Sequence, residues 1–308
     1  MHVSRLQAFL LLALANLFWA GNWIAGRALR DAFEPASLNF WRWTIATLAL
    51  APFALPGLRA RLPLLRRHAG ILLLLALTGV AVFQSLVYLG LRSTTAVNAV
   101  LLNSSMPLFM LLCSWAIERE HATPRQIAGM LISLAGIAVI LSRGDARALL
   151  QLELHAGDVW ILLAMPVWGI YSVLLKRRPA ELGAVEFLFV ISVAGVLMLA
   201  PVAAVQALQG PLRMPGMEQA LGVLYMGLAA SVFAFICWNR GVAVVGANAA
   251  GFTVHLLPAF GTLLAILFLG ESFAAFHAAG VAIILAGVLL ATGSPPIGSD
   301  PNGVSKRR

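Results

Sequence analysis

The sequence predicts an all-α membrane protein with ten transmembrane helices in two inverted-topology repeats of five helices each. Three observations indicate this fold class. Of the 308 residues, 61% are hydrophobic and only 11% are charged, whereas a soluble domain carries about 25% charged residues. The apolar residues fall into runs of about twenty residues, the length that a membrane-spanning helix requires. The second half of the chain also repeats the residue pattern of the first half.

Ten apolar runs are long enough to cross a bilayer, and none alternates as a barrel strand would. The first run contains Asn16 and no small-residue cleavage pattern, so we interpret it as a retained span and not as a signal peptide. We expect the polar tail, residues 293–308, to be disordered and cytoplasmic. The predicted spans are residues 6–26, 36–55, 69–91, 95–117, 123–141, 156–176, 183–207, 217–239, 246–269 and 275–292.

The start of the fifth span has a clear helix signal. Thr123 is suited to cap the helix, Pro124 follows at its first position, and Gln126 lies three residues after the cap. Within this span Gly129 and Gly136 are seven residues apart and share one helix face, which permits close packing of a second helix. That second helix belongs either to the same chain or to a partner, so we expect a monomer or a weak homodimer.

Basic residues indicate the orientation of the spans. Fourteen of the 21 lie on the side of the N-terminus, six lie on the other side, and Arg42 lies inside the second span. Because cytoplasmic loops carry the excess of Lys and Arg, we expect both termini in the cytoplasm and the protein in the inner membrane. The fourteen are Arg5, Arg59, Arg61, Arg66, Arg67, Arg119, Arg125, Lys176, Arg177, Arg178, Arg240, Lys306, Arg307 and Arg308; the six are Arg27, Arg30, Arg92, Arg143, Arg147 and Arg213.

The net charge of +9 therefore reflects the basic residues that orient the spans in the membrane, and it does not indicate nucleic-acid binding. No polar segment combines basic and aromatic residues into a patch of the kind that nucleic-acid-binding proteins carry. Cys113 and Cys237 both lie inside apolar runs, so the sequence predicts no structural disulfide.

An internal repeat divides the chain into two halves. Residues recur at a constant step of 151 in the later spans, and at a step of 149 in the earlier ones, where Trp19 matches Trp168. The predicted repeats are residues 1–145 and 150–292. Because five is odd, the second repeat enters the membrane from the opposite face, and such repeats hold substrate at their interface. The residues that recur at the step of 151 are Gly90, Pro107, Glu120, Gly129, Ala135 and Gly136, matched by Gly241, Pro258, Glu271, Gly280, Ala286 and Gly287.

The pattern resembles the EamA-type permeases of the drug/metabolite transporter superfamily over residues 6–292. This resemblance implies a ten-helix bundle whose central cavity is lined by spans one, three, four, six, eight and nine. It also implies the export of small metabolites, often amino acids. The residues that carry it are Phe18-Trp19-Ala20-Gly21-Asn22-Trp23, Phe40-Trp41-Arg42-Trp43, Glu120 with Gly129 and Leu134-Ala135-Gly136, and Gly270-Glu271 with Gly280 and Leu285-Ala286-Gly287.

Polar and aromatic side chains inside the spans are the candidates for substrate binding, because a polar group in hydrocarbon is costly without a function. Within each span the chosen residues share one helix face or neighbour each other. Such a lining suits an amphipathic metabolite. Pro107 and Pro258 are predicted hinges, because proline interrupts backbone hydrogen bonding. The candidate substrate-binding residues are Asn16, Trp19, Trp23, Gln84, Tyr88, Asn98, Ser105, Phe109, Trp168, Tyr171, Phe235, Trp238, Phe252 and His255.

Several candidates have an alternative role that the sequence leaves open. Amides such as Asn16, Gln84 and Asn98 also serve as hydrogen-bonding links between helices. Tryptophans near span ends, Trp23 among them, also form the aromatic belt, and Trp168 also suits core packing. His255 is either a buried neutral histidine or a site for ligand or proton. For Arg42 we expect a side chain that reaches the outer surface, with pairing to a substrate carboxylate as the second interpretation.

All twelve acidic residues fall in loops or at span ends. A mid-membrane carboxylate that would relay protons is therefore not predicted, and we expect uniport, or coupling through His255. The sequence contains no metal-ligand cluster, nucleophile elbow or phosphate loop, so we expect neither enzyme activity nor a cofactor or metal. The predicted function is export of small metabolites, including amino acids and aromatic or amphipathic compounds, by alternating access. A proton-coupled multidrug or metabolite antiporter is the alternative, and a membrane-embedded enzyme, a receptor or a scaffold is a remote one.

Overall fold

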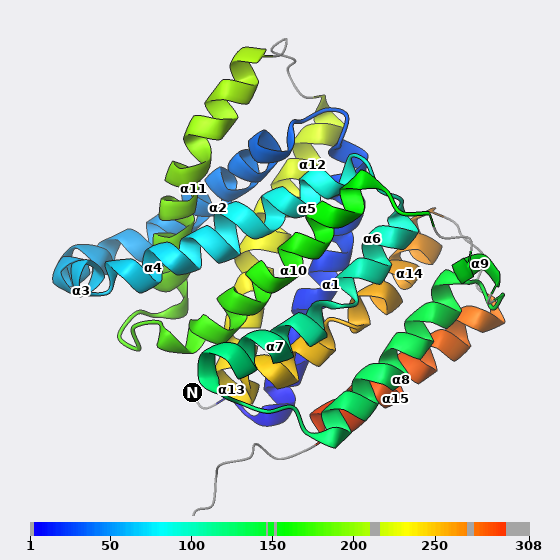
Figure 1. Cartoon of the computed structure of the whole chain (residues 1–308). Helices are drawn as coiled ribbons and strands as arrows, with labels where there is room; N and C mark the ends of the chain where they lie inside the picture. Colours follow the sequence, from blue (N-terminus) through cyan, green and yellow to red (C-terminus); the bar gives the residue numbers. More distant parts are fainter. Residues whose placement is uncertain (1–2, 146, 151–152, 210–215, 270–273, 294–308) are drawn as a thin grey trace, which may run out of the picture.

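The computed structural model describes residues 3–145, 147–150, 153–209, 216–269 and 274–293. Within these ranges every regular element is a helix and no strand occurs, which confirms the predicted all-α class. The helices pack side by side into one bundle (Figure 1). Of the predicted tail, residues 293–308, only residue 293 is among the described residues.

The first part of the chain forms α1 (Arg5–Leu29), α2 (Pro35–Leu58), η1 (Arg59–Arg61), α3 (Leu62–Arg67), α4 (Ala69–Ala76), η2 (Leu77–Val82), α5 (Phe83–Leu91), α6 (Ala96–Asn103), α7 (Met106–Glu118), α8 (Pro124–Leu141) and α9 (Arg147–Leu150). The second part forms α10 (Ala156–Leu174), η3 (Leu175–Arg177), α11 (Ala184–Gln209), α12 (Met217–Gly227), η4 (Leu228–Phe233), α13 (Ala234–Thr253), α14 (Leu256–Leu269) and α15 (Ala275–Thr292). The η2 and η4 segments are π-helical.

Eight helical stretches among the described residues are long and apolar enough to cross a membrane, where the sequence predicts ten spans. The second predicted span forms α2, a helix of 24 residues with Asn39 and Arg42 in its interior, and it is not among the eight. The ninth predicted span is divided between α13 and α14, and the backbone of Gly246 within α13 leaves the helical conformation with φ of +82°. These helices have the length and composition of a multi-pass membrane protein, whereas ten separate spanning helices are not found among the described residues.

Irregular backbone occurs at corresponding places in the two parts of the chain. Ser104 and Ser105 separate α6 from α7, and Val254 and His255 separate α13 from α14. The π-helical segments η2 and η4 begin at Leu77 and Leu228, which are also 151 residues apart. A π-helix leaves carbonyl groups without their usual α-helical partners, and such segments often mark functional sites.

Pro107 and Pro258 follow these interruptions and lie in the first turns of α7 and α14. Proline is tolerated in the first turn because the amide proton that it lacks would have no helical partner there. The two prolines therefore begin helices and do not bend continuous ones. The predicted helix start at Thr123 is confirmed, since its side chain accepts a hydrogen bond from the Gln126 amide at 3.2 Å.

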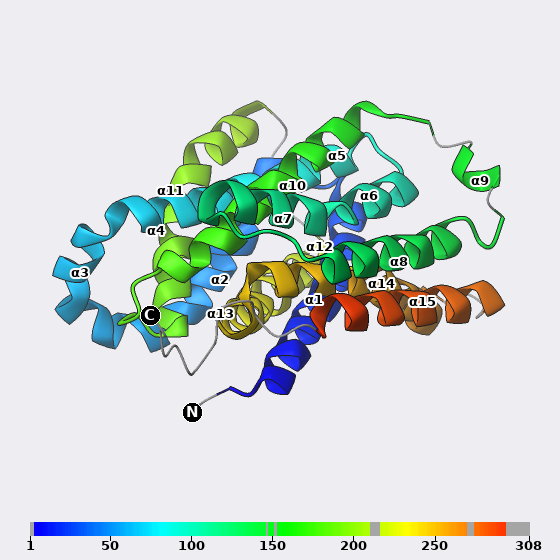
Figure 2. The ribbon, with the colours of Figure 1, turned by 60° about the horizontal axis from the view of Figure 1, so that its bottom comes forward.

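The α8 and α15 helices lie side by side at one edge of the bundle in both views (Figures 1 and 2). A Cβ atom added to Gly129 would lie 2.5 Å from the Gly287 carbonyl oxygen, and one on Gly136 would lie 2.7 Å from that of Gly280. The helices are therefore antiparallel, and the repeated glycines face each other within the chain. In the repeat, Gly129 corresponds to Gly280 and Gly136 corresponds to Gly287. Each α8 glycine therefore contacts the α15 residue that corresponds to the other α8 glycine, and the pairing is self-complementary.

Polar contacts connect loops and helix ends at the two ends of the bundle. At the end that holds the N-terminus, Arg5 Nη2 donates to the Thr292 carbonyl at 2.7 Å, and Lys176 Nζ lies 2.8 Å from a Glu118 carboxylate oxygen. At the other end, an Arg92 nitrogen lies 2.5 Å from a Glu34 carboxylate oxygen. Each contact joins loops or span ends that the sequence predicts to lie on one side of the membrane.

Candidate functional site

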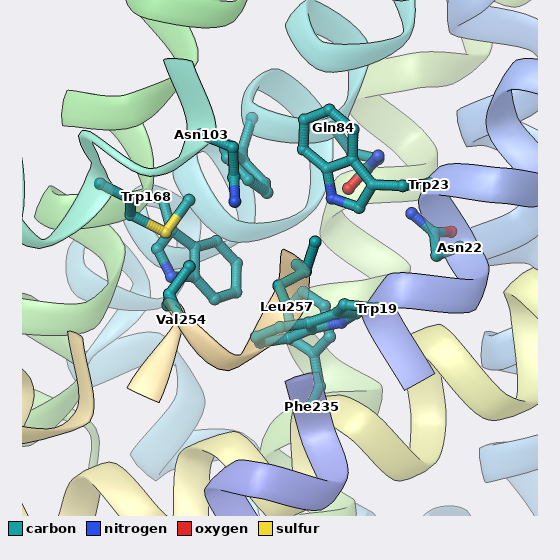
Figure 3. A pocket seen from close by; sticks show the side chains of 11 residues that line it. Trp19, Asn22, Trp23, Gln84, Asn103, Trp168, Phe235, Val254 and Leu257 are labelled. Carbon is teal, nitrogen blue, oxygen red and sulfur yellow. The ribbon is translucent and has the colours of Figure 1, made fainter. Parts of the chain in front are cut away.

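A small cavity lies where the interrupted helices meet (Figure 3). The α1, α5, α6, α7, α10, α13 and α14 helices contribute to its wall. Its volume of about 20 Å³ leaves room for roughly one water molecule. The residues that line it are Trp19, Asn22, Trp23, Phe83, Gln84, Asn103, Met106, Trp168, Phe235, Val254 and Leu257.

Aromatic rings form most of the wall around Trp168, which is 1% exposed. Its ring centroid lies 5.1 Å from that of Trp19, 4.7 Å from Phe83 and 5.5 Å from Phe235. These separations are typical of offset and edge-to-face aromatic pairs. The Trp19 indole donates from Nε1 to the Ala230 carbonyl in η4 at 3.0 Å, which fixes the orientation of that ring.

The lining residues correspond across the repeat. Trp19 and Trp168 are 149 residues apart, and both line the cavity. Three further pairs are 151 residues apart: Gln84 with Phe235, Asn103 with Val254, and Met106 with Leu257. The residues of the last two pairs lie in or directly beside the helix interruptions. The cavity is therefore built from equivalent positions of the two repeated segments.

The two segments contribute different chemistry to the wall. The first segment supplies the amide side chains of the lining among the described residues, Asn22, Gln84 and Asn103, together with apolar ones, whereas the second supplies only the apolar Trp168, Phe235, Val254 and Leu257. The amide nitrogens of Gln84 and Asn103 are buried and make no hydrogen bond to another described residue. An unpaired buried donor costs about 1–3 kcal/mol, so both amides are suited to an acceptor group on a ligand.

Arg42 is not part of this lining and is 1% exposed. Its Nε donates to Ser231 Oγ at 2.5 Å, Nη1 to the Tyr88 hydroxyl at 3.2 Å, and Nη2 to the Ala230 carbonyl at 3.0 Å. The expectation that this side chain reaches the outer surface is wrong. The carbonyl that η4 presents, together with two hydroxyl groups, holds the guanidinium inside the bundle.

Five of the fourteen predicted site residues line the cavity: Trp19, Trp23, Gln84, Trp168 and Phe235. Tyr88 and Tyr171 lie beside it, where Tyr88 donates to Asn22 Oδ1 at 3.1 Å and Tyr171 to Asn239 Oδ1 at 2.8 Å. Trp238 is fully buried, and its ring centroid lies 5.5 Å from that of Trp168.

The remaining six predicted residues lie outside the lining. Asn16 donates to Thr253 Oγ1 at 3.2 Å, and Asn98 donates to Asp158 Oδ2 at 2.8 Å near the start of α10. Both amides thus join helices to each other. The Ser105 hydroxyl bonds back to the Leu102 carbonyl at 2.6 Å. The other two aromatic residues, Phe109 and Phe252, pack in hydrophobic clusters.

His255 joins the two helix interruptions. Its Nε2 lies 3.0 Å from the carbonyl oxygen of Ser104, the residue that corresponds to it in the repeat. Because a carbonyl only accepts, Nε2 carries the proton in this contact. The Nδ1 atom is buried and has no hydrogen-bond partner among the described residues.

Sequence reasoning missed six lining residues: Asn22, Phe83, Asn103, Met106, Val254 and Leu257. Asn22 lies within the aromatic motif of the first span, three residues after Trp19, and this spacing places it beside Trp19 on the helix. The last four surround the interruptions, where the periodicity of one continuous helix no longer applies. These four residues could have been found by applying the repeat step of 151 to every residue near Pro107 and Pro258.

A larger hollow of about 590 Å³ opens at the end of the bundle that holds the N-terminus. Glu120 borders it and accepts a hydrogen bond from Asn248 Nδ2 at 3.4 Å. Asn248 lies two residues after Gly246, where the backbone of α13 leaves the helical conformation. A carboxylate oxygen of Glu120 also lies 3.4 Å from Lys176 Nζ. The residues that line the hollow are Arg5, Arg119, Glu120, His121, Thr123, Gln126, Val244, Val245, Gly246, Asn248, Ala249, Ala291 and Thr292.

Comparison with known proteins places this architecture in a family. The model of the EamA-like transporter family matches residues 6–142 and 155–293. A protein of Archaeoglobus fulgidus, described as an uncharacterized transporter, is 30% identical over 293 residues, which cover 93% of this chain and 97% of that protein. A protein of Streptantibioticus cattleyicolor, described as a probable terminal-alkyne amino-acid exporter, is 29% identical over 281 residues and 91% of each chain. A solved crystal structure with 24% sequence identity has a TM-score of 0.73 and covers 94% of this chain and 97% of its own, which shows the same fold.

Proposed function

We infer that this chain, which belongs to the EamA-like transporter family, exports small amphipathic metabolites, amino acids among them. Membership in the family makes it a membrane transporter. The observation that carries the finer proposal is the combination of three amide side chains with aromatic and aliphatic side chains in one cavity wall. A ligand with a polar head and an apolar side chain fits such a wall. The relative from Streptantibioticus cattleyicolor that is described as a probable terminal-alkyne amino-acid exporter supports this proposal.

We propose that residues 1–145 and 150–292 form two inverted five-helix repeats that rock about the cavity. The spacing of 151 residues between η2 and η4 and between α8 and α15, and of 150 residues between the two interruptions, supports this arrangement. A cavity of about 20 Å³ is too small for an amino acid, so the site has to widen when it opens to either side. The interruptions before Pro107 and Pro258 are the proposed hinges, because backbone bonding is already broken there.

The proposed location is the inner membrane, with both termini in the cytoplasm. The excess of basic residues on the side of the N-terminus supports this orientation. The hollow beside Glu120 opens at the same end of the bundle, so in this orientation it is the cytoplasmic entrance. The bilayer and the small-molecule substrate are the partners of a monomer or a weak homodimer.

Transport assays in proteoliposomes test this function. The full chain is reconstituted, and the release of preloaded leucine, methionine and phenylalanine is compared with that from protein-free liposomes. We expect release of at least one amino acid to rise about tenfold or more, because the cavity offers both amide groups and apolar side chains. Equal release from both preparations across a wider panel of amphipathic metabolites would exclude the proposal.

The same liposomes distinguish uniport from proton coupling, which is the alternative mechanism. Each described acidic residue lies in a loop or in the first or last turn of its helix. His255 is buried next to Val254, which lines the cavity. An imposed pH gradient should therefore drive no accumulation, or only accumulation that His255→Ala abolishes. Accumulation that survives this substitution would exclude both uniport and proton coupling through His255.

A further inference from the structure

We propose that the cavity selects substrates that carry a carboxylate, and that the buried positive charge of Arg42 provides this selectivity. The inference rests on the proposed transport function and names the class of substrate. The guanidinium of arginine stays protonated in proteins, so a full positive charge lies inside the membrane part of the bundle. A charge in this position is costly and usually serves a function.

No acidic side chain among the described residues neutralises Arg42. Its three hydrogen bonds go to two hydroxyl groups and a backbone carbonyl, all of them uncharged. The six ion pairs that the described residues form involve other basic residues and lie at the ends of the bundle. The charge of Arg42 is therefore available to an anion that enters from outside the protein.

Two short routes connect Arg42 to the cavity wall. On one, Arg42 donates to the Tyr88 hydroxyl, which donates in turn to Asn22 Oδ1, and Asn22 lines the cavity. On the other, Arg42 and Trp19 both donate to the Ala230 carbonyl oxygen, at 3.0 Å each. On either route a single hydrogen-bonding group, the Tyr88 hydroxyl or the Ala230 carbonyl, lies between the guanidinium and a residue that lines the cavity. In a medium of low dielectric constant its attraction for an anion in the cavity is strong.

A purely structural role does not explain the charge. The π-helical segment η2 presents similar carbonyl groups, those of Val80 and Ala81, and the neutral amide of Asn39 binds both, at 2.9 and 3.2 Å. An uncharged side chain is therefore sufficient to cap such a segment. The positions that correspond to Arg42 in the second repeat, at steps of 149 and 151, are Ile191 and Val193. The fold thus requires no cation there.

Ligand titration of the full chain in lipid nanodiscs tests the inference. Intrinsic tryptophan fluorescence follows binding, because Trp19, Trp23 and Trp168 line the cavity. The probes are L-leucine, L-leucinamide, 4-methylpentanoate and 4-methylpentanamide, so each carboxylate has an amide of the same shape. We expect each carboxylate to bind at least tenfold more tightly than its amide. Equal affinities, or no carboxylate binding, would overturn the inference in the unmodified protein.

Variants then assign the preference to Arg42. In Arg42→Gln the carboxylate and amide affinities should agree within about twofold, with the amide affinity unchanged, whereas Arg42→Lys should keep a preference. Arg30→Gln removes the same charge at a partly exposed position in the loop after α1 and should change nothing. A preference that persists in Arg42→Gln contradicts the inference. If this variant does not fold, the loss of the preference in Arg42→Lys contradicts it.

The outcome is separable from that of the transport assay. Carboxylate preference without flux would refute the proposed export function and leave the role of Arg42 intact. Flux that is equal for the carboxylates and their amides would support export and refute the role of Arg42.

Discussion

Alanine in place of Trp168 should lower transport about tenfold or more, and Trp19→Ala should have a similar effect. Both rings line the cavity and pack edge to face against each other, with centroids 5.1 Å apart. Without either ring the apolar wall loses the surface that would hold the side chain of the substrate. We expect amino-acid flux in proteoliposomes to fall while the amount of protein in the membrane stays near that of the unmodified chain.

The matched control is Trp41→Ala, because Trp41 is 50% exposed on the outer surface of α2. This variant should transport normally. Trp168→Phe retains an aromatic ring and separates loss of the wall from loss of folding, since it should keep more transport than Trp168→Ala at equal protein levels. Normal flux in both Trp19→Ala and Trp168→Ala would show that the cavity does not hold the substrate.

Alanine at Gly129 or Gly287 should destabilise the protein by about 1–3 kcal/mol, the usual cost of overpacking. A Cβ atom on Gly287 would lie 2.5 Å from the Gly129 carbonyl oxygen and 2.5 Å from the Ser133 nitrogen, so α8 and α15 would have to separate. The backbone atoms on the facing helix cannot rotate away as a side chain would. The apparent Tm of the purified protein in detergent measures this effect.

Gly261→Ala is the matched control for these glycine variants. It lies in α14, and a Cβ atom there would have no heavy atom within 4 Å. Because alanine favours a helix over glycine by roughly 1 kcal/mol, this variant should be as stable as the unmodified chain or more so. Equal Tm values for Gly129→Ala, Gly287→Ala and Gly261→Ala would contradict the close contact between the repeated glycines.

The sequence predicts what depends on composition and on the repeat. Long apolar runs require helices in a bilayer, and the structure is helical throughout the described residues. The recurrence of Trp19 as Trp168 identified two residues that line one cavity. Thr123 and Gln126 marked a helix start because capping is a local interaction, which neighbouring residues determine.

The sequence did not predict features that depend on contacts between distant helices. Arg42 was expected at the surface, but the carbonyl of Ala230 and the hydroxyl of Ser231 lie nearly 190 residues away in the chain and hold it inside. Asn98 shared a face with other candidates, yet its amide bonds to Asp158. Nothing local in the sequence reveals such partners. The candidate residues were chosen as if each span were one continuous helix. The interruptions at Asn103 and Val254 break that helical periodicity.

Labelling of single cysteines tests most directly the central claim, that two inverted repeats enclose one transport cavity. With Cys113 and Cys237 replaced, Leu62→Cys and Leu208→Cys place one thiol after the second predicted span and one at the end of the seventh, at positions that are 49% and 88% exposed. A maleimide that does not cross membranes is added to intact spheroplasts. We predict that Leu208→Cys reacts at once and that Leu62→Cys reacts only after the membrane is permeabilised. Reaction of both thiols from the same side would contradict the inversion, and with it the proposed path through the cavity.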